Sequence, residues 1–189
     1  ASYLAPLQEP LAQLSRRYPR LDIRIVGTTS APLQLPNLRQ MRWDLAQERD
    51  ELHQCDIGVM PMPDDEWARG KCGFKALLYM SAGIPVVASP VGINTEIVRE
   101  GINGFLASTP AEWANRLSQL IEDPALRERL GASGRTIVEE EYSLRVSAPR
   151  LLRVLKDVGR RCRCDAVFRR RISLQRCREL YYNSLVFRK

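Results

Sequence analysis

The residues best suited to chemistry lie in the stretch GKCGF, where Gly70, Lys71, Cys72 and Gly73 come directly before an apolar segment with helical spacing. The first turn of a helix has unpaired backbone N–H groups and a partial positive charge. Glycines let an anion approach that backbone closely, and Lys71 adds a full positive charge. The stretch therefore predicts a phosphate-binding helix start. The alternative is that the glycines only turn the chain and that Lys71 is solvated. The stretch is neither a Walker A loop nor a GxGxxG loop.

Side chains that bind metals are not grouped here as they are in most metal sites. Asp64, Asp65 and Glu66 adjoin one another in a polar loop, an arrangement typical of solvated carboxylates. The chain has five cysteines without a CxxC pair, and its single histidine, His53, falls inside a predicted helix with a structural role. We therefore expect no metal site and no zinc. The cysteines are interpreted as reduced thiols.

The elements that must position these residues alternate between strands and helices. Apolar runs at residues 23–26, 56–60 and 85–88 predict parallel strands, and the helix at 74–82 links the last two. Other helices are predicted near residues 3–18, 44–55, 110–121, 124–141 and 143–158. This order is typical of an α/β, Rossmann-like parallel sheet with helices on both faces. Ligands of such sheets bind beyond the carboxyl ends of the strands.

Charge divides the chain into two parts. Residues 1–156 hold 19 basic and 19 acidic residues, whereas 157–189 hold 10 basic and 3 acidic ones. We therefore predict a domain over residues 1–158 and a basic tail over 159–189, which contains Cys162, Cys164 and Cys177. The body is not a nucleic-acid-binding surface by its charge, and no specific nucleic acid is expected. The tail is expected to contact anionic membranes weakly and in a salt-sensitive way.

The expected compartment follows from two missing signals. No apolar run reaches the length of a membrane span. The first residues lack a basic stretch followed by an apolar one, as a signal peptide would have. We therefore expect a cytoplasmic protein with peripheral membrane contact through its tail.

The order of segments resembles a known family over about residues 3–156. The resemblance is carried by LDIRIVG, CDIGVMPM, GFKALLYMSAGIPVVASPVGINTEIVREGINGFLA and EWANRLSQLIEDPALRERLGASGRTIVEEEYSL. In this order they resemble the C-terminal, donor-binding domain of the retaining glycosyltransferases of family 4 (group 1), which have the GT-B fold. The resemblance implies a nucleotide diphosphate sugar as donor, an acceptor that is not identified, and transfer without metal or cofactor.

The resemblance also implies positions for the parts of the donor. The diphosphate would lie at the helix start formed by Gly70, Cys72, Gly73 and Phe74. Lys71 is the one candidate for a catalytic role. The base would lie against Gly27 and Trp43, and the ribose near Tyr79. The sugar would lie near Lys71 and near the turn that contains Val91, Gly92, Asn94 and Glu96.

Two departures from the family pattern qualify these expectations. The family usually carries Glu-x7-Glu across this helix, and the corresponding positions here are Lys71 and Tyr79. The sequence also lacks the family's first strand with its glycine-rich loop, and the N-terminal acceptor-binding domain. That strand is normally central, so its absence leaves unpaired edges that invite association. A partner chain or a rearranged tail would have to fill the gap.

The leading hypothesis is the nucleotide-sugar-binding half of a glycosyltransferase, inactive without its acceptor domain. A non-catalytic interaction module that has kept the fold is the main alternative, favoured by Lys71, Tyr79 and the missing strand. A sugar-nucleotide epimerase of related fold is the third, and the lone His53 inside a helix and the absence of a catalytic acid pair speak against it.

Overall fold

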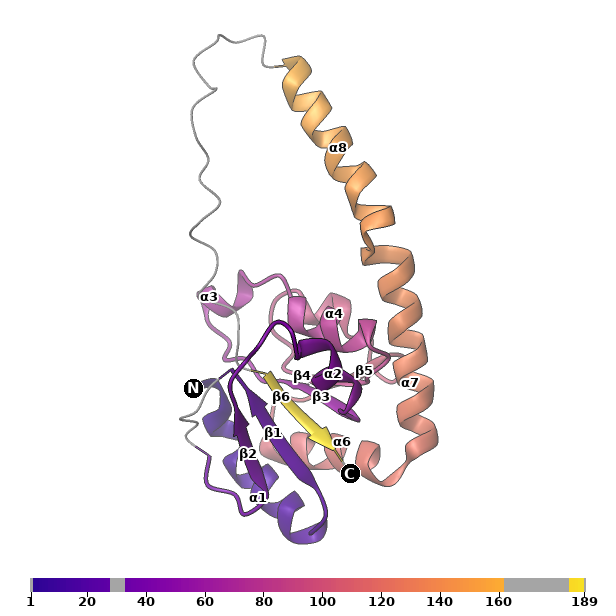
Figure 1. The fold of residues 1–189 in the computed structure, drawn as a ribbon. Helices are drawn as coiled ribbons and strands as arrows, with labels where there is room; N and C mark the ends of the chain where they lie inside the picture. Colours follow the sequence, from indigo (N-terminus) through magenta and orange to yellow (C-terminus); the bar gives the residue numbers. More distant parts are fainter. Residues whose placement is uncertain (1, 28–32, 162–183, 189) are drawn as a thin grey trace.

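A computed structural model describes residues 2–27, 33–161 and 184–188, which form a six-stranded sheet covered by helices on both faces (Figure 1). The strands are β1 (Asp22–Val26), β2 (Leu38–Met41), β3 (Ile57–Met60), β4 (Val86–Ala88), β5 (Gly104–Leu106) and β6 (Ser184–Arg188). The α-helices are α1 (Gln8–Arg17), α2 (Glu48–His53), α3 (Glu66–Arg69), α4 (Phe74–Ser81), α5 (Asn94–Ile97), α6 (Pro110–Glu122), α7 (Pro124–Ile137) and α8 (Leu144–Arg161). A 3-10 helix, η1 (Ser2–Leu7), precedes α1, and a π-helical turn, η2 (Val138–Tyr142), follows α7.

The sheet has the strand order β2-β1-β6-β3-β4-β5. β1 pairs with β2, β3 with β4, and β4 with β5, all in parallel. The register between β3 and β4 sets Gly58 opposite Val86, and α4 makes the connection between these strands. The predicted α/β fold with parallel strands is therefore confirmed.

β6 is the one described strand that runs the other way. It pairs antiparallel with β1, where Ile23 faces Phe187, and with β3, where Gly58 faces Val186. A doubly wound sheet has its first strand at this central position. Sequence analysis assigned residues 184–188 to a tail outside the domain, whereas the structure makes them a strand of the sheet. Of the two ways to fill the gap, the rearranged tail is the one observed.

Buried apolar residues lie on both faces of the sheet. On one face, η1, α1 and α6 pack over Ile23, Ile25 and Val87. On the other face, α4 packs over Val86 and Ala88. β4 thus sends alternate side chains into two separate cores, because successive residues of a strand point to opposite faces.

Capping residues fix where the helices next to the core begin. The Thr109 hydroxyl accepts a hydrogen bond from the Glu112 N–H, and the Glu112 carboxylate accepts one from the Thr109 N–H. These two bonds form a capping box at the start of α6. Asp123 is the N-cap of α7, where its carboxylate accepts a hydrogen bond from the Leu126 N–H. Two predicted boundaries were wrong. The helix expected over residues 44–55 is limited to α2, and residues 38–41, expected in a loop, form β2.

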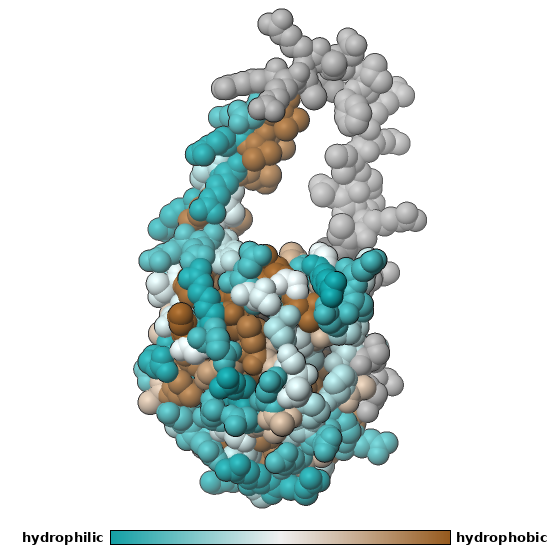
Figure 2. Space-filling model, turned by 180° about the vertical axis from the view of Figure 1, so that it is seen from behind, coloured by the Kyte–Doolittle hydropathy of each residue, from teal (hydrophilic) through white to brown (hydrophobic). Residues whose placement is uncertain are grey.

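α8 stands apart from the rest of the molecule. It leaves the sheet domain after η2 and projects away from it (Figure 1). Figure 2 shows hydrophobic residues along one side of the projecting helix and hydrophilic residues along the other. None of the helices among the described residues has the length and apolar character needed to cross a bilayer. The expectations for the cysteines and charges of residues 162–183 lie outside the described residues.

Candidate functional site

The predicted site lies where the carboxyl ends of β3 and β4 meet the start of α4. Gly73 is the N-cap of α4 and has a φ of 66°, in the left-handed region that favours glycine. A Cβ at this position would overlap Ile97 Cδ1 and come within 2.9 Å of Ile93 Cγ2. The glycine is therefore required for close packing of the helix start against α5. This packing, rather than an open space for an anion, determines the residue at this position.

The start of α4 carries backbone N–H groups that the helix itself cannot bond. The Gly73 carbonyl accepts the first intrahelical bonds, from Ala76 at 3.0 Å and Leu77 at 3.3 Å. The N–H groups that precede Ala76 in this turn have no intrahelical acceptor, as at the start of any α-helix. They contribute the partial positive charge expected of a helix N-terminus.

Two lysines add full charges at the same place. The Lys71 ammonium lies 4.4 Å from the centroid of the Tyr3 ring, a cation–π contact that connects the helix start to η1. Burial, together with the neighbouring positive charge of Lys71, lowers the pKa of Lys75 to about 8. The charges of Lys71 and Lys75 therefore repel each other, and a bound anion would relieve this repulsion.

A buried asparagine lies beside this pair. Asn94 is fully buried at the start of α5, and its Nδ2 donates to the Ser89 carbonyl at 3.1 Å. Its Oδ1 is buried and accepts no hydrogen bond from the described residues. That oxygen faces Gly73, since it lies 3.5 Å from the point that a Gly73 Cβ would occupy. A buried acceptor without a donor costs about 1–3 kcal/mol, and Ile93 and Ile97 fill the space beside it.

Ser89 extends the polar surface at the carboxyl end of β4. Its hydroxyl oxygen accepts a hydrogen bond from the Met62 N–H at 2.9 Å, so the loop after β3 is held against the loop after β4. Its hydroxyl proton is not used in that bond and can be donated to a ligand.

The turn over residues 89–93 packs tightly on α3. Gly92 has a φ of 56°, and a Cβ there would lie 2.8 Å from the Arg69 carbonyl oxygen. Val91 is buried, and Glu96 is exposed on the outer side of α5. Of the residues that the resemblance placed in this turn, Asn94 is the one whose side chain faces the start of α4.

Tyr79 is not at an accessible position. Its side chain has no exposed surface and packs over Gly58 of β3, where a Cβ would overlap the ring. A ribose at the edge of the sheet could not contact Tyr79 without displacing the residues that cover it. In this conformation, Tyr79 therefore cannot contact a ribose.

The residues expected to hold the base lie at β1 and β2. The Gly27 N–H donates to the Met41 carbonyl at 2.9 Å, which joins the carboxyl ends of the two strands. Trp43 is half-buried and donates from Nε1 to Glu48 at 2.9 Å. Gly70, Cys72 and Phe74, expected at the helix start, are exposed there.

The carboxylates and thiols of the described residues have separate places. Among these residues, no three or more His, Cys, Asp or Glu side chains are grouped so that they could hold a metal ion. Asp64 forms a two-bond ion pair with Arg69, which lowers the pKa of that carboxyl, and Asp65 caps α3. Cys55 and Cys72 are free thiols, as predicted. Burial raises the pKa of the Cys55 thiol to about 12, so this thiol is unreactive.

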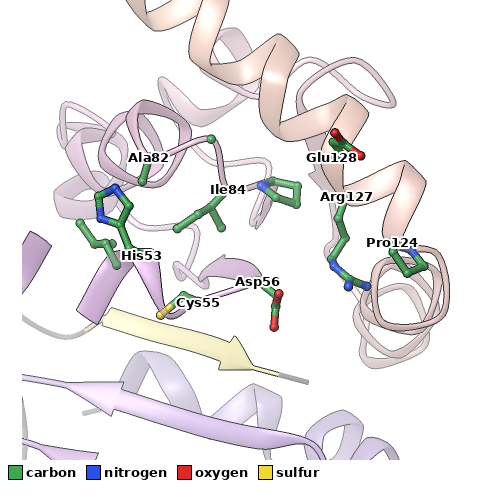
Figure 3. Close-up of a pocket in the computed structure, with 11 residues that line it drawn as sticks. His53, Cys55, Asp56, Ala82, Ile84, Pro124, Arg127 and Glu128 are labelled. Carbon is green, nitrogen blue, oxygen red and sulfur yellow. The ribbon is translucent and has the colours of Figure 1, made fainter. Parts of the chain in front are cut away.

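A cavity of about 310 Å³ lies at the opposite edge of the sheet (Figure 3). It is bounded by residues that precede β3 and β4 and by the first turns of α7. His53 and Cys55 face Arg127 and Glu128 across it. Because it opens at the amino ends of the parallel strands, it is not where a doubly wound sheet binds its ligand.

The sequence analysis named Lys71, Gly73 and Asn94, which the structure places around the start of α4, but it did not name Lys75 or Tyr3. Lys75 is the second residue of the helix predicted over residues 74–82, so its closeness to the helix start could have been recognised from the sequence. The contact of Lys71 with Tyr3 joins distant parts of the chain, and nothing in the sequence indicates it.

Comparisons with known proteins agree with this fold. The family model described as "Glycosyl transferases group 1" matches residues 6–123. The D-inositol 3-phosphate glycosyltransferase of Nocardioides sp. is 32% identical over 154 residues, which cover 68% of this chain and 32% of that protein. The chain thus spans about a third of that relative's length.

Two solved structures have the same fold at low sequence identity. Sucrose-phosphate synthase from Thermosynechococcus elongatus matches with a TM-score of 0.69 and 19% identity, over 82% of this chain and 43% of that one. Anabaena HepE, solved in complex with UDP and glucose, matches with a TM-score of 0.58 and 21% identity, over 65% of this chain and 32% of that one.

Proposed function

The chain belongs to the group 1 glycosyltransferases, and we propose that it is the nucleotide-sugar-binding half of a retaining, metal-independent enzyme. Such an enzyme moves a sugar from a nucleotide diphosphate to an acceptor. The proposal rests mainly on one observation, the dibasic pair of Lys71 and Lys75 at the unpaired N–H groups of α4. The acceptor is not identified, and the chain spans about a third of the Nocardioides relative.

The diphosphate of the donor suits the dibasic pair. Its charge would be met by two ammonium groups and by the positive end of α4, without a metal ion. Structures of Anabaena HepE with UDP and glucose and with UDP-glucose support a donor of this class. A sugar hydroxyl could accept a hydrogen bond from Ser89 Oγ at the carboxyl end of β4.

Lys71 is assigned the catalytic contact in this proposal. When the bond from the anomeric carbon to the diphosphate oxygen breaks, negative charge builds up on the leaving group. A cation fixed beside that oxygen stabilises the charge as it develops, which lowers the barrier. The contact with Tyr3 restricts the Lys71 ammonium to one region before the donor binds. Retention of configuration is proposed from family membership, and product analysis with the complete protein tests it.

Calorimetric titration of this chain with UDP, GDP and ADP tests the proposal. Lys71→Ala and Lys75→Ala are each expected to weaken nucleotide binding about ten- to a hundredfold, the worth of a charge-assisted hydrogen bond. Arg20→Ala, which removes an exposed cation far from α4, is the matched control. Lys71→Glu should abolish binding, because it reverses the charge at the diphosphate. Equal affinity in all four variants would exclude the start of α4 as the site.

A non-catalytic interaction module is the second candidate, and the burial of Tyr79 favours it. Because the buried Tyr79 side chain cannot contact a ribose, the ribose loses one of its expected contacts. The two candidates differ in one measurement, since a module that has lost its donor site would bind none of the three nucleotides while remaining folded. The epimerase alternative is not favoured, because His53 is exposed at the other edge of the sheet and bonded to the Arg49 carbonyl.

A further inference from the structure

Tyr3 connects the first described element of the chain to the start of α4. The centroid of its ring lies 4.4 Å from the Lys71 ammonium, although the two residues are far apart in the sequence. The ring is carried by η1, whose Leu4 and Leu7 are buried in the core that η1 shares with α1 and α6. The position of the ring is therefore set by the core of the domain and not by the loop that contains Lys71.

Lys71 has a fixed backbone but no counter-ion. Its N–H donates to the Ala68 carbonyl at 3.1 Å, two residues before the N-cap of α4. None of the ion pairs among the described residues includes its ammonium. A lysine side chain is a long flexible stem, so a fixed backbone alone leaves the ammonium free to sample many positions. The cation–π contact with Tyr3 restricts those positions.

An aromatic ring holds a lysine differently from a carboxylate. A carboxylate would cancel the ammonium charge, and a diphosphate would have to compete with it for the lysine. A ring attracts the cation through its quadrupole and carries no net charge, so the full charge of the lysine stays available to an anion. The charge of Lys71 does act on its surroundings, because it contributes to the lowered pKa of Lys75. The contact with Tyr3 thus provides a cation that is both restricted in position and uncompensated.

We propose that Tyr3 is a positioning residue of the donor site, whose ring holds the Lys71 ammonium for the diphosphate without neutralising it. This inference rests on the proposed function, because it takes the start of α4 as the place where the diphosphate binds. It goes further by making η1, which carries no binding motif in its sequence, a part of that site. Tyr3 acts through Lys71 rather than by touching the donor.

Calorimetric titration of the 189-residue chain with UDP, GDP and ADP tests the proposal. Tyr3→Leu removes the ring but keeps an apolar side chain, and it should weaken nucleotide binding about two- to fivefold, the worth of an exposed cation–π contact. Tyr3→Phe keeps the ring and should bind nucleotide within about twofold of the parent. The matched control is Tyr18→Leu, which removes a ring 5.3 Å from the Arg17 guanidinium at the other end of α1 and should leave nucleotide binding unchanged.

A double-mutant cycle separates positioning from a merely structural role. In the Lys71→Ala background the ring has no ammonium to hold, so Tyr3→Leu should cause no further loss of affinity. A structural role of Tyr3 would weaken binding by the same factor with and without Lys71, and that result would overturn the proposal. Thermal melting followed by circular dichroism checks that each variant is folded.

Proton NMR adds a readout that does not require a nucleotide. The ring current of Tyr3 should displace the ε-methylene signal of Lys71, which is assigned by its loss in Lys71→Ala. Tyr3→Leu should return this signal to the ordinary position of a lysine, whereas Tyr3→Phe should keep it displaced. A signal that is the same in all three proteins would show that the ring does not hold the ammonium.

The outcomes distinguish this inference from the proposed function. If Lys71→Ala weakens nucleotide binding and Tyr3→Leu leaves it unchanged, the donor site stands and Tyr3 is not its positioning residue. If the parent binds none of the three nucleotides, the proposed function fails and the inference fails with it. A loss of affinity that Tyr3→Leu and Tyr3→Phe share would assign the effect to the hydroxyl group rather than to the ring, and would also overturn the proposal.

Discussion

Lys75 combines a positive charge with a position from which most water is excluded. Burial and the neighbouring Lys71 lower its pKa to about 8, against a usual value of 10.5. Its charged form therefore destabilises the folded chain below about pH 8. That penalty is relieved as the pH rises from 8 to 10.5, where the unfolded chain still binds the proton and the folded chain does not. A bound diphosphate would reverse this preference, because it stabilises the charged form.

We therefore predict that nucleotide binding weakens as the pH rises above about 8, while the free chain becomes more stable over the same range. Titration calorimetry with UDP between neutral and alkaline pH measures the first effect, and thermal unfolding without nucleotide measures the second. Lys75→Arg is the control, since a guanidinium keeps its charge throughout. Its UDP affinity should not fall in this range. A parallel decline in both proteins would show that Lys75 is not the titrating group.

The candidate site could be predicted from sequence only where residue type determines the chemistry. Gly73 and Lys71 were named because glycines and a lysine directly before a helix are typical of a phosphate-binding helix start. Tyr79 was assigned to a ribose because a tyrosine can bond a hydroxyl, but its type and spacing cannot distinguish a ring at the sheet edge from one in the core. What decides its place is the absence of a side chain at Gly58, on a different strand.

At the scale of elements, the packing of α4 against α5 sets the geometry of the helix start. Gly73 fits between them because Ile97 and Ile93 fill the space that its side chain would take. A side chain at this position would therefore act first on the fold, by separating the two helices, and only then on ligand access. This differs from the sequence-based expectation that a larger residue would simply block an anion.

We predict that Gly73→Ala lowers the free energy of unfolding by about 1–3 kcal/mol, from the overlap with Ile97 and the left-handed φ. Ile97→Val removes the overlapping methyl group and should cost about 0.5–1.5 kcal/mol alone. In the double variant the losses should be less than additive, because part of the overlap is gone. Urea unfolding of the four proteins measures this. Strictly additive losses would mean that a Cβ at residue 73 does not overlap the terminal methyl group of Ile97.

The elements that sequence missed are those without a periodic apolar pattern. β3 and β4 were found because every residue in them is buried and apolar. β2 was missed because its sequence, LRQM, lies at the outer edge of the sheet with two exposed residues. β6 was missed for another reason. Its place depends on pairing with strands more than a hundred residues away, for which a single sequence gives no local signal.

At the scale of the whole molecule, β6 joins two groups of strands that do not otherwise pair. β2 and β1 lie on one side of it, and β3, β4 and β5 lie on the other. The sheet is continuous through residues 184–188 alone, so these backbone hydrogen bonds connect the half that would hold the base to the half that would hold the diphosphate.

We predict that Val186→Pro destabilises the whole chain, because proline removes a backbone donor from a central strand. The loss should be about 1–3 kcal/mol for the carbonyl left without a donor, or roughly 2–12 °C in the melting temperature of a chain of this size. Val186→Ala keeps the N–H group and is the matched control. Melting followed by circular dichroism compares them. If the proline variant melted no lower than the alanine variant, residues 184–188 would not be holding the sheet together.

The position of β6 also has a consequence for the order of events during translation. A ribosome synthesises residues 184–188 after every other described element, so a nascent chain that has reached residue 161 contains all five parallel strands but not the one between them. Until then the facing edges of β1 and β3 present open N–H and C=O groups to any other extended chain nearby. The extent of misassembly in the cell would therefore depend on the time between the synthesis of α8 and the synthesis of β6. Slowly translated codons for residues 162–183 would lengthen that time.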